Sequence, residues 1–280
     1  MSIEVMAAVL VAAVLNASWN ALVKGAHDSF VGATLICAGC AAVAIPVMLL
    51  RPLPLAASYP FMVASAFVQT GYFVLIAVVY RRADLSVAYP ITRGTAPLIA
   101  TAAAALLLAE WPGLTATFGI VLVCVGVLGI AGEGLRRGGI DGPSLRAALL
   151  NALCIASYTI IDGEGGRRSG DPVAYTAWVS MAAALVFLPL AFMLRGRALA
   201  APLLQGWRVA LAGGGASFAS YGIVIWAMSR APIGLVAALR EASVLFAAAI
   251  GAWFLKEPIT PARYVAAVLV VGGLACMRAG

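Results

Sequence analysis

Charged residues are scarce in this chain of 280 residues: Asp, Glu, Lys and Arg make up 10% of it, against about a quarter in a soluble globular domain. Hydrophobic residues make up 64%, and the mean hydropathy is +1.04. A soluble protein of this length cannot cover its surface with so few charges. The composition therefore predicts a membrane protein whose main partner is the lipid bilayer.

Groups that carry enzyme chemistry are also few. The single histidine, His27, excludes the HExxH motif of zinc proteases. An intramembrane aspartyl protease needs paired aspartates within the spans, and no nucleophile, base and orienting group occur together. We therefore predict a protein that is not an enzyme and that holds no metal and no cofactor. The aspartates all fall at or near predicted span ends: Asp28, Asp84, Asp141, Asp162 and Asp171.

The five cysteines and the net charge of +7 have simple explanations in a membrane protein. Each cysteine lies in an apolar run, as expected for a small buried side chain rather than a disulfide. The basic residues mostly lie in short loops, where positive charge keeps a loop in the cytoplasm. We therefore expect neither nucleic acid nor an obligate protein partner. The cysteines are Cys37, Cys40, Cys124, Cys154 and Cys276.

Long apolar runs fill the rest of the chain. A helix needs about 20 apolar residues to cross a hydrocarbon core of about 30 Å, and ten such runs leave only short loops between them. No cleavable leader is evident, so the first run is interpreted as the first span. The predicted spans are 3–23, 30–50, 59–80, 85–108, 114–132, 143–162, 172–194, 207–228, 233–254 and 260–278.

The two halves of the chain share a pattern. With a shift of 147 residues, Arg93 coincides with Arg240 and Glu110 with Glu257, and the fourth and ninth spans align without a gap. We therefore predict two five-helix repeats, residues 1–140 and 141–280. Because five is an odd number, the second repeat enters the membrane from the opposite side. Inverted repeats around a midplane site are a recurrent plan of secondary transporters.

The Lys and Arg residues of the predicted loops divide unevenly between the two sides. Eleven lie in the breaks after the odd-numbered spans, and five lie on the other side. Because basic loops remain in the cytoplasm, the distribution predicts that both termini face outward.

Proline near the ends of the fourth and ninth spans provides a resemblance. Glu110 with Pro112, Glu257 with Pro258, and the Pro-interrupted segment AYPITRGTAPL resemble the EamA branch of the drug/metabolite transporter superfamily. The resemblance covers the whole chain and is greatest to bacterial amino-acid exporters, including the YddG-like exporters of aromatic amino acids. It implies a central cavity lined by spans 1, 3, 4, 6, 8 and 9 and closed by the paired ends of the halves. Relatives also move sugars, nucleotide sugars and triose phosphates, so the fold does not fix the substrate.

Arg93 and Arg240 lie deep in their spans, where a charge costs at least about 2.5 kcal/mol and so is expected to face a cavity or a partner. A guanidinium suits the planar carboxylate of a substrate; a snorkelling or salt-bridged structural arginine is the alternative. Glu241 is expected to couple a proton, to receive a substrate ammonium or to pair with a charge across the bundle. The other predicted substrate-binding residues are deep aromatic and amide side chains: Trp19, Asn20, Gln69, Tyr72, Tyr89, Tyr158 and Tyr221.

A second set of residues is predicted to shape or close the bundle. Glu110 and Glu257 end their helices, where the macrodipole disfavours a negative charge by about 0.3–1 kcal/mol, so a structural or gate contact must offset it. Pro90 and Pro97 are expected to bend the fourth span and free carbonyls for the cavity. Gly126, Gly129 and Gly132 are expected to let the fifth span pack closely on a neighbour.

Together these observations predict a multi-pass protein of the bacterial inner membrane, an all-α bundle of ten spans. It is expected to export small metabolites by alternating access, with amino acids, aromatic ones included, as the leading substrates. The alternative is a permease for another solute class, such as a sugar, a sugar phosphate or a phosphonate. A channel is disfavoured because no filter-like segment or ring of like charges is present.

Overall fold

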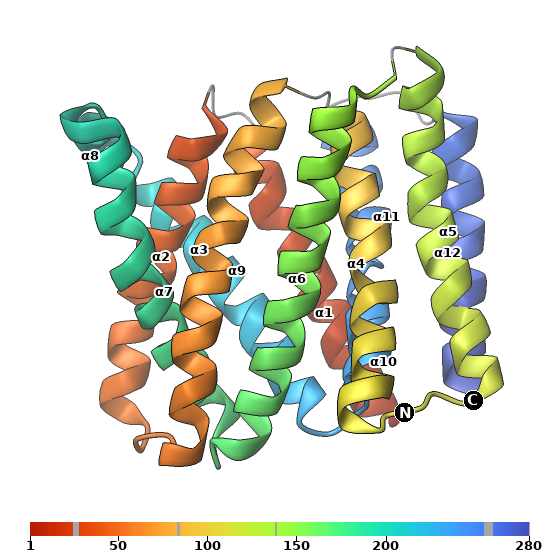
Figure 1. Cartoon of the computed structure of the whole chain (residues 1–280), viewed down its shortest axis with the longest axis horizontal. Helices are drawn as coiled ribbons and strands as arrows, with labels where there is room; N and C mark the ends of the chain where they lie inside the picture. The colour runs from red at the N-terminus through yellow and green to blue at the C-terminus, as the bar shows by residue number, and fades with distance from the viewer. Residues whose placement is uncertain (25–27, 83–84, 138, 255–259, 280) are drawn as a thin grey trace.

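The computed structural model describes the whole chain except residues 25–27, 83–84, 138, 255–259 and 280 (Figure 1). The described residues form helices and connections and contain no strand. Ten helical segments are long and apolar enough to cross a membrane, which confirms the predicted number of spans. The elements are α1 (Ile3–Lys24), α2 (Ser29–Leu50), η1 (Ala56–Ser58), α3 (Tyr59–Arg82), α4 (Leu85–Leu108), α5 (Leu114–Arg137), α6 (Gly142–Arg168), α7 (Pro172–Arg195), η2 (Gly196–Leu199), α8 (Ala200–Gln205), α9 (Trp207–Met228), α10 (Ile233–Arg240), α11 (Ser243–Phe254) and α12 (Pro261–Ala279).

Three aspartates cap the N-termini of helices and so mark where those helices begin. Asp28, Asp141 and Asp171 precede α2, α6 and α7, and their side chains accept hydrogen bonds of 2.9–3.2 Å from first-turn N–H groups. Such a cap contributes about 1 kcal/mol. The predicted position at a span end is confirmed for these three, and Asp84 lies outside the described residues. For Asp162 the prediction is wrong, because α6 continues six residues beyond it.

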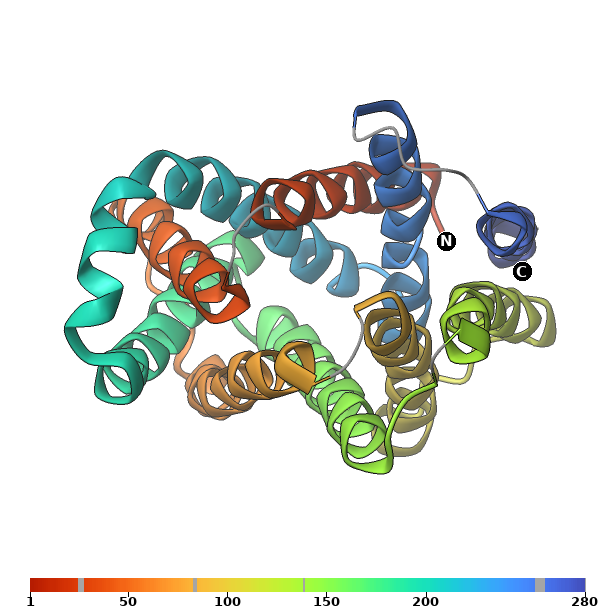
Figure 2. The ribbon, with the colours of Figure 1, turned by 90° about the horizontal axis from the view of Figure 1, so that it is seen from above.

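The spans form one bundle with both termini on the same face (Figure 1). We call this the lower face, and the opposite one, which carries the α1–α2, α5–α6 and α7–α9 connections, the upper face. Seen from above, the helices surround a central region, and the α5–α12 pair stands at one side (Figure 2). Within the bundle α1 packs on α9 and α6 on α3, while α10 and α11 pack on α1 and α4 packs on α6.

Two helix crossings depend on glycines that face each other. Between α2 and α9, a Cβ added at Gly39 would lie 1.8 Å from the carbonyl oxygen of Ala210, and one added at Gly214 would lie 2.5 Å from the Gly39 carbonyl carbon. Between α5 and α12, a Cβ added at Gly119 would lie 2.5 Å from the carbonyl oxygen of Gly273. Small residues at a crossing let two helix backbones approach in a membrane, and any side chain here would force the helices apart.

The predicted close packing of the α5 glycines is confirmed at one position. A Cβ at Gly126 would lie 3.1 Å from the carbonyl oxygen of Ala266 on α12. For Gly129 and Gly132 the prediction is wrong, because no described atom of a neighbouring helix lies within 4 Å of an added Cβ. These two glycines lie outside the contact between α5 and α12.

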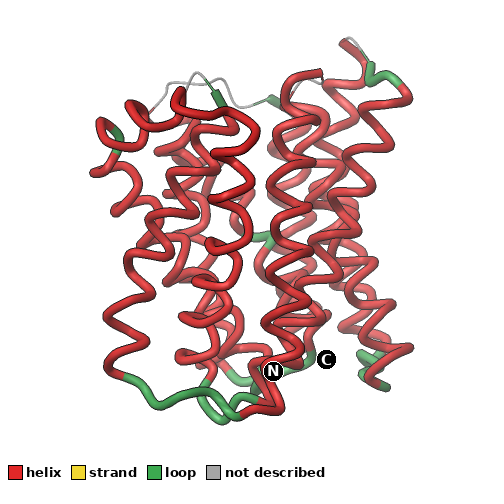
Figure 3. Tube along the Cα trace, turned by 60° about the vertical axis from the view of Figure 1, so that its left-hand side comes forward, coloured by secondary structure: helices red, strands yellow, loops and turns green. Residues whose placement is uncertain are grey.

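The ninth span is broken inside the bundle, which corrects the prediction of one helix over residues 233–254. α10 ends at Arg240 and α11 begins at Ser243, and the turn between them lies at mid-height (Figure 3). The backbone N–H groups of Glu241 and Ala242 donate to carbonyls only three residues back. This tighter bonding keeps the polar backbone groups satisfied at a depth where no water is available.

Candidate functional site

One cavity of about 140 Å³ lies between the helices, roughly ten times the space that a single water molecule needs. Its lining comes from the upper half of α1, α3 and α4 and from the middle of α2, α6, α7 and α9, so the cavity lies nearer the upper face. The lining residues are Asn16, Trp19, Asn20, Ile36, Cys37, Cys40, Gln69, Tyr72, Phe73, Tyr89, Arg93, Tyr158, Ser180, Ala183, Ser217, Phe218, Ser220, Tyr221, Val224 and Arg240.

Nine of the ten predicted substrate-binding residues line this cavity. The exception is Glu241, which is 0% exposed and lies behind the lining. Lining the same cavity does not show that these side chains bind a substrate, so substrate binding remains a prediction. The nine are Trp19, Asn20, Gln69, Tyr72, Tyr89, Arg93, Tyr158, Tyr221 and Arg240.

Glu241 lies between two arginines. Its Oε2 is 2.9 Å from Nε of Arg93 and its Oε1 is 3.9 Å from Nε of Arg240. The N–H of Arg93 is not directed at the carboxylate, since neither Nε nor the Glu241 oxygens meet the geometry of a hydrogen bond. The contact is therefore an ion pair. Glu241 thus pairs with a charge across the bundle, one of the alternatives predicted for it.

Two guanidiniums share this one carboxylate. Arg93 has the closer contact and also reaches Ser243, with Nη2 3.5 Å from Oγ. Arg240 has only the longer contact, and its Nε has no hydrogen-bond partner. The local charge is therefore about one positive unit in excess, and Arg240 is the guanidinium that remains available to the cavity.

Tyrosines form one wall of the cavity. The rings of Tyr72 and Tyr158 meet edge to face with centroids 5.8 Å apart, and those of Tyr158 and Tyr221 do so at 6.1 Å. Edge-to-face pairs of this kind contribute about 0.5–1.5 kcal/mol each beyond the area they bury. The three rings hold one another in place and present an aromatic surface with hydroxyl groups.

An amide cluster forms another part of the lining, near the end of α1. Asn16 Oδ1 accepts hydrogen bonds from Trp19 Nε1 at 3.1 Å and from Asn20 Nδ2 at 3.5 Å. Asn20 Nδ2 also donates to the backbone carbonyl of Asn16 at 2.7 Å. This network fixes the indole and the two amides beside the cavity.

A buried carboxylate at the floor of the cavity was not among the predicted site residues. Asp162 is 0% exposed. Its Oδ2 accepts hydrogen bonds from Ser65 at 2.8 Å, from Gln69 at 3.2 Å and from Tyr221, and its Oδ1 accepts one from Tyr175 at 2.8 Å. In the sequence, Asp162 stands out only as a lone aspartate before the glycine-rich segment 163–166. The predicted span boundaries place that segment in a loop.

The glycine-rich segment is in fact helical and tightly packed. A Cβ at Gly163 would lie 2.5 Å from Cδ1 of Ile233, and one at Gly165 would lie 2.2 Å from the hydroxyl of Tyr175. These glycines let α6 approach α7 and α10 below the cavity. Their role is therefore close contact, and the approach brings the Tyr175 hydroxyl to Asp162.

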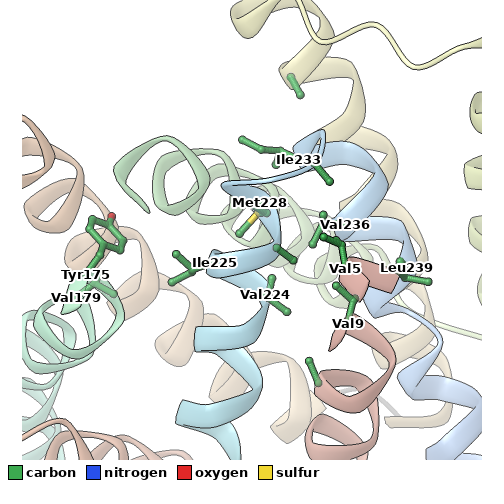
Figure 4. Packing of buried hydrophobic residues seen from close by; sticks show 14 of the residues in the cluster. Val5, Val9, Tyr175, Val179, Val224, Ile225, Met228, Ile233, Val236 and Leu239 are labelled. Atoms are coloured by element: carbon green, nitrogen blue, oxygen red, sulfur yellow. The ribbon is translucent and has the colours of Figure 1, made fainter. Parts of the chain in front are cut away.

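On the lower side of the cavity, hydrophobic side chains pack together in the interior (Figure 4). They come from the lower halves of α1, α3, α7 and α9 and from α10, which ends at mid-height. The cavity is therefore closed toward the lower face. The cluster includes Val5, Val9, Met62, Tyr175, Val179, Val224, Ile225, Met228, Ile233, Val236 and Leu239.

A polar contact at the lower face lies beside this cluster. The carboxylate of Glu110 accepts a hydrogen bond from the backbone N–H of Ile233 at 2.8 Å and forms an ion pair with Arg167. Arg167 also donates to the carbonyl oxygens of Met228 at 2.8 Å and Ala231 at 3.1 Å. Glu110 thus stands at the N-terminus of α10, where the helix dipole favours a negative charge.

This contact offsets the unfavourable dipole that Glu110 meets at the end of its own helix. The sequence predicted a structural contact at that residue. Its role as a gate remains a prediction, and Glu257 lies outside the described residues. Pro90 and Pro97 lie within α4, which runs unbroken. A proline frees the carbonyl four residues before it, and that these carbonyls face the cavity stays a prediction.

Two sets of lining residues were missed. α2 contributes Ile36, Cys37 and Cys40, and α7 contributes Ser180 and Ala183. Spans 2 and 7 therefore line the cavity in addition to the six implied by the resemblance. Their apolar or small side chains carry no signal that distinguishes a cavity wall from a lipid-facing surface. All five cysteines are free thiols.

Ten apolar spans around a cavity with buried ionisable groups define a multi-pass membrane protein. Residues 144–279 match the EamA-like transporter family, so the second half of the chain carries a domain of that family. No curated protein matches the sequence. A solved structure described as "Crystal structure of protein" is similar over 99% of this chain and 96% of its own, with a TM-score of 0.77 and 20% identity. At that identity the likeness shows the fold alone.

Proposed function

We propose that this protein is a secondary transporter that exports amino acids, aromatic ones included, across the bacterial inner membrane by alternating access. The EamA-like domain and the ten spans support a membrane transporter of small solutes. The observation that carries the substrate class is the pairing of two buried guanidiniums with one carboxylate beside an aromatic wall.

Alternating access is often built on two related halves, and we propose that residues 1–140 and 141–280 are inverted repeats. The helix contacts support this arrangement, since corresponding helices of the two halves exchange partners. α1 packs on α9 as α6 packs on α3, and α10 and α11 pack on α1 as α4 packs on α6. Five spans in each half and termini on one face agree with opposite insertion.

The charges of the cavity favour a solute with one carboxylate. Arg240 lines the cavity and has no hydrogen-bond partner at Nε, so a substrate carboxylate would remove the excess positive charge. Arginine suits that group because its planar fork matches a carboxylate. At the floor, Gln69 and Tyr221 separate the cavity from the negative charge of Asp162, which favours a substrate ammonium at that end.

The aromatic lining favours a solute with an apolar or aromatic side chain. Trp19, Tyr72, Tyr158 and Tyr221 all border the cavity, and mixed apolar and polar lining of this kind is typical of small-molecule sites. An aromatic side chain bound there would gain edge-to-face contacts.

The direction of transport follows from the loops. The cavity lies nearer the upper face, and the interior is closed toward the lower face. The upper face holds the described members of the set of eleven loop Lys and Arg residues that predict the cytoplasmic side. In this orientation the site is poised to receive a solute from the cytoplasm, as an exporter requires.

The alternative substrates fit the charges less well. A sugar phosphate or phosphonate carries up to two negative charges, which exceed the one unit of positive charge that Glu241 leaves uncompensated. A neutral sugar would leave that excess positive charge in place, and a buried uncompensated charge is costly.

The test is flux into proteoliposomes of radiolabelled phenylalanine and, separately, of a radiolabelled triose phosphate. We expect phenylalanine flux that unlabelled amino acids inhibit and that Arg240→Gln weakens at low phenylalanine concentration. Flux of the triose phosphate alone would overturn the amino-acid proposal. Cysteine labelling of the loops on intact cells tests the orientation, and labelling of both termini from the cytoplasmic side would overturn the direction of export.

A further inference from the structure

We propose that Asp162 is the binding site of the proton that drives transport. This inference rests on the transporter function proposed above and adds its coupling ion. It depends on the position of this carboxylate, which lies between the cavity and the hydrophobic cluster that closes the lower face. Two of its donors, Gln69 and Tyr221, line the cavity, while a third, Tyr175, belongs to the hydrophobic cluster.

The hydrogen bonds to Asp162 tie four helices together. Ser65 and Gln69 come from α3, Tyr175 from α7 and Tyr221 from α9, and all donate to the carboxylate on α6. α3 belongs to the first half of the chain and the other three helices to the second. A change at Asp162 therefore acts on a junction between the halves.

No charged side chain neutralises Asp162. Its donors are hydroxyls and an amide, and the described residues contain no ion pair to it. The charged groups on the helices packed around α6 have other partners: Arg93 and Arg240 have Glu241, and Arg167 has Glu110 and Glu164. The titratable groups that face Asp162 are the tyrosines Tyr158, Tyr175 and Tyr221.

The donor pattern fits a carboxylate and not a carboxylic acid. An ionised carboxylate only accepts hydrogen bonds, at about four lone-pair positions; here three donors meet Oδ2 and one meets Oδ1. A proton on Oδ2 would turn one of those positions into a donor. Oδ2 could then no longer accept from Ser65, Gln69 and Tyr221 together. If the proton binds Oδ2, at least one link between α6 and α3 or α9 breaks.

A proton fits this site better than a metal cation. A sodium ion needs several oxygen ligands around it, whereas the side-chain oxygens of Ser65, Tyr175 and Tyr221 lie against the carboxylate itself. No group of three or more His, Cys, Asp or Glu residues lies together in the described part of the chain. The proton needs only the carboxylate.

This arrangement makes the solute and the proton mutually exclusive. A substrate ammonium at the cavity floor stabilises the ionised carboxylate, and a proton removes the negative charge that attracts the ammonium. One proton enters in exchange for one solute that leaves. The pH gradient of a bacterium, acidic outside, would therefore drive export.

The first test needs no substrate. Infrared difference spectra of the purified protein, recorded while the pH is lowered, report the carboxylic-acid C=O band of a newly protonated side chain. We expect this band in the wild type and in Glu4→Gln, a matched carboxylate-to-amide change at an exposed position, and its loss in Asp162→Asn. Tyr221→Phe removes one donor to the ionised form, so its band should appear at higher pH, which tests the site even if Asp162→Asn does not fold.

The second test uses proteoliposomes with an acidic interior and radiolabelled phenylalanine outside. The wild type and Glu4→Gln should accumulate phenylalanine several-fold above the outside concentration. Asp162→Asn should only equilibrate it, at the level reached without a pH gradient. Accumulation by Asp162→Asn equal to that of the wild type, or an unchanged infrared band in this variant, would overturn the proposal. If the band is lost as expected but no variant moves phenylalanine, the proton site stands and the proposed substrate is wrong.

Discussion

Replacing Glu241 with glutamine would leave two guanidiniums inside the bundle with no carboxylate. In the wild type the carboxylate is completely buried, 2.9 Å from Nε of Arg93 and 3.9 Å from Nε of Arg240. Removing one partner of a buried ion pair destabilises a protein by about 3–5 kcal/mol, because the remaining charge is buried without compensation. A loss of that size is a large share of the roughly 5–15 kcal/mol by which folded proteins are stable.

The assay is unfolding of the purified protein by a graded fraction of denaturing detergent, followed by circular dichroism. Glu4→Gln is the control and should stay within about 0.5 kcal/mol of the wild type, as surface changes usually do. The double variant Arg93→Gln, Glu241→Gln removes one of the two unpaired charges and should recover part of the loss. A Glu241→Gln protein as stable as the control, or a double variant no more stable than the single one, would refute the ion-pair reasoning.

Three other predictions concern the cavity, a helix crossing and a loop. Arg240→Gln should raise the phenylalanine concentration for half-maximal flux by about 10–100-fold, because the substrate carboxylate would lose one charged hydrogen bond. An unchanged value would exclude Arg240 from the site. Gly39→Ala should destabilise the bundle by about 1–3 kcal/mol through overpacking. Gly129→Ala should be neutral or slightly stabilising in the same detergent assay, because no described atom of a neighbouring helix lies within 4 Å of its added Cβ. Equal effects of the two changes would contradict the close crossing of α2 and α9. Burial acts to raise the pKa of Asp28, but hydrogen bonds from Arg195 and from a backbone N–H outweigh it and lower the pKa below the usual 3.8. The stability that this pair contributes is therefore present at neutral pH and lost as the pH falls through the lowered pKa, so Asp28→Asn should weaken the acid dependence of the melting temperature, and an unaltered dependence would contradict the pairing.

The spans were predictable because hydropathy and length leave little choice in a membrane. A polar backbone must satisfy its own hydrogen bonds in lipid, so each apolar run of about 20 residues becomes a helix. What failed were the boundaries that depend on tertiary contacts. Residues 163–168 read as a glycine-rich loop, yet they continue α6 because α7, α9 and α10 pack against the glycines. Residues 196–205 read as a break, yet they form η2 and α8.

The site was predictable where a residue type conflicts with its surroundings. A deep arginine such as Arg93 or a tyrosine such as Tyr158 stands out in an apolar span, and both line the cavity. The break after Arg240 was not predictable from local sequence, because the segment contains neither proline nor glycine. It becomes understandable only with Glu241 in place, since the carboxylate reaches Arg93 on α4 from within the turn.

The asymmetry of the charges follows from packing around α4. In the repeat that we propose, Gly94 is the counterpart of Glu241, so the first half supplies an arginine without a carboxylate. A Cβ at Gly94 would lie 2.7 Å from Cγ of Leu128 and 3.1 Å from the carbonyl oxygen of Cys124, both on α5. A glutamate there would push α5 away from α4. Two related halves can therefore keep both arginines but only one glutamate, which leaves the cavity with the single positive charge that a carboxylate substrate would neutralise.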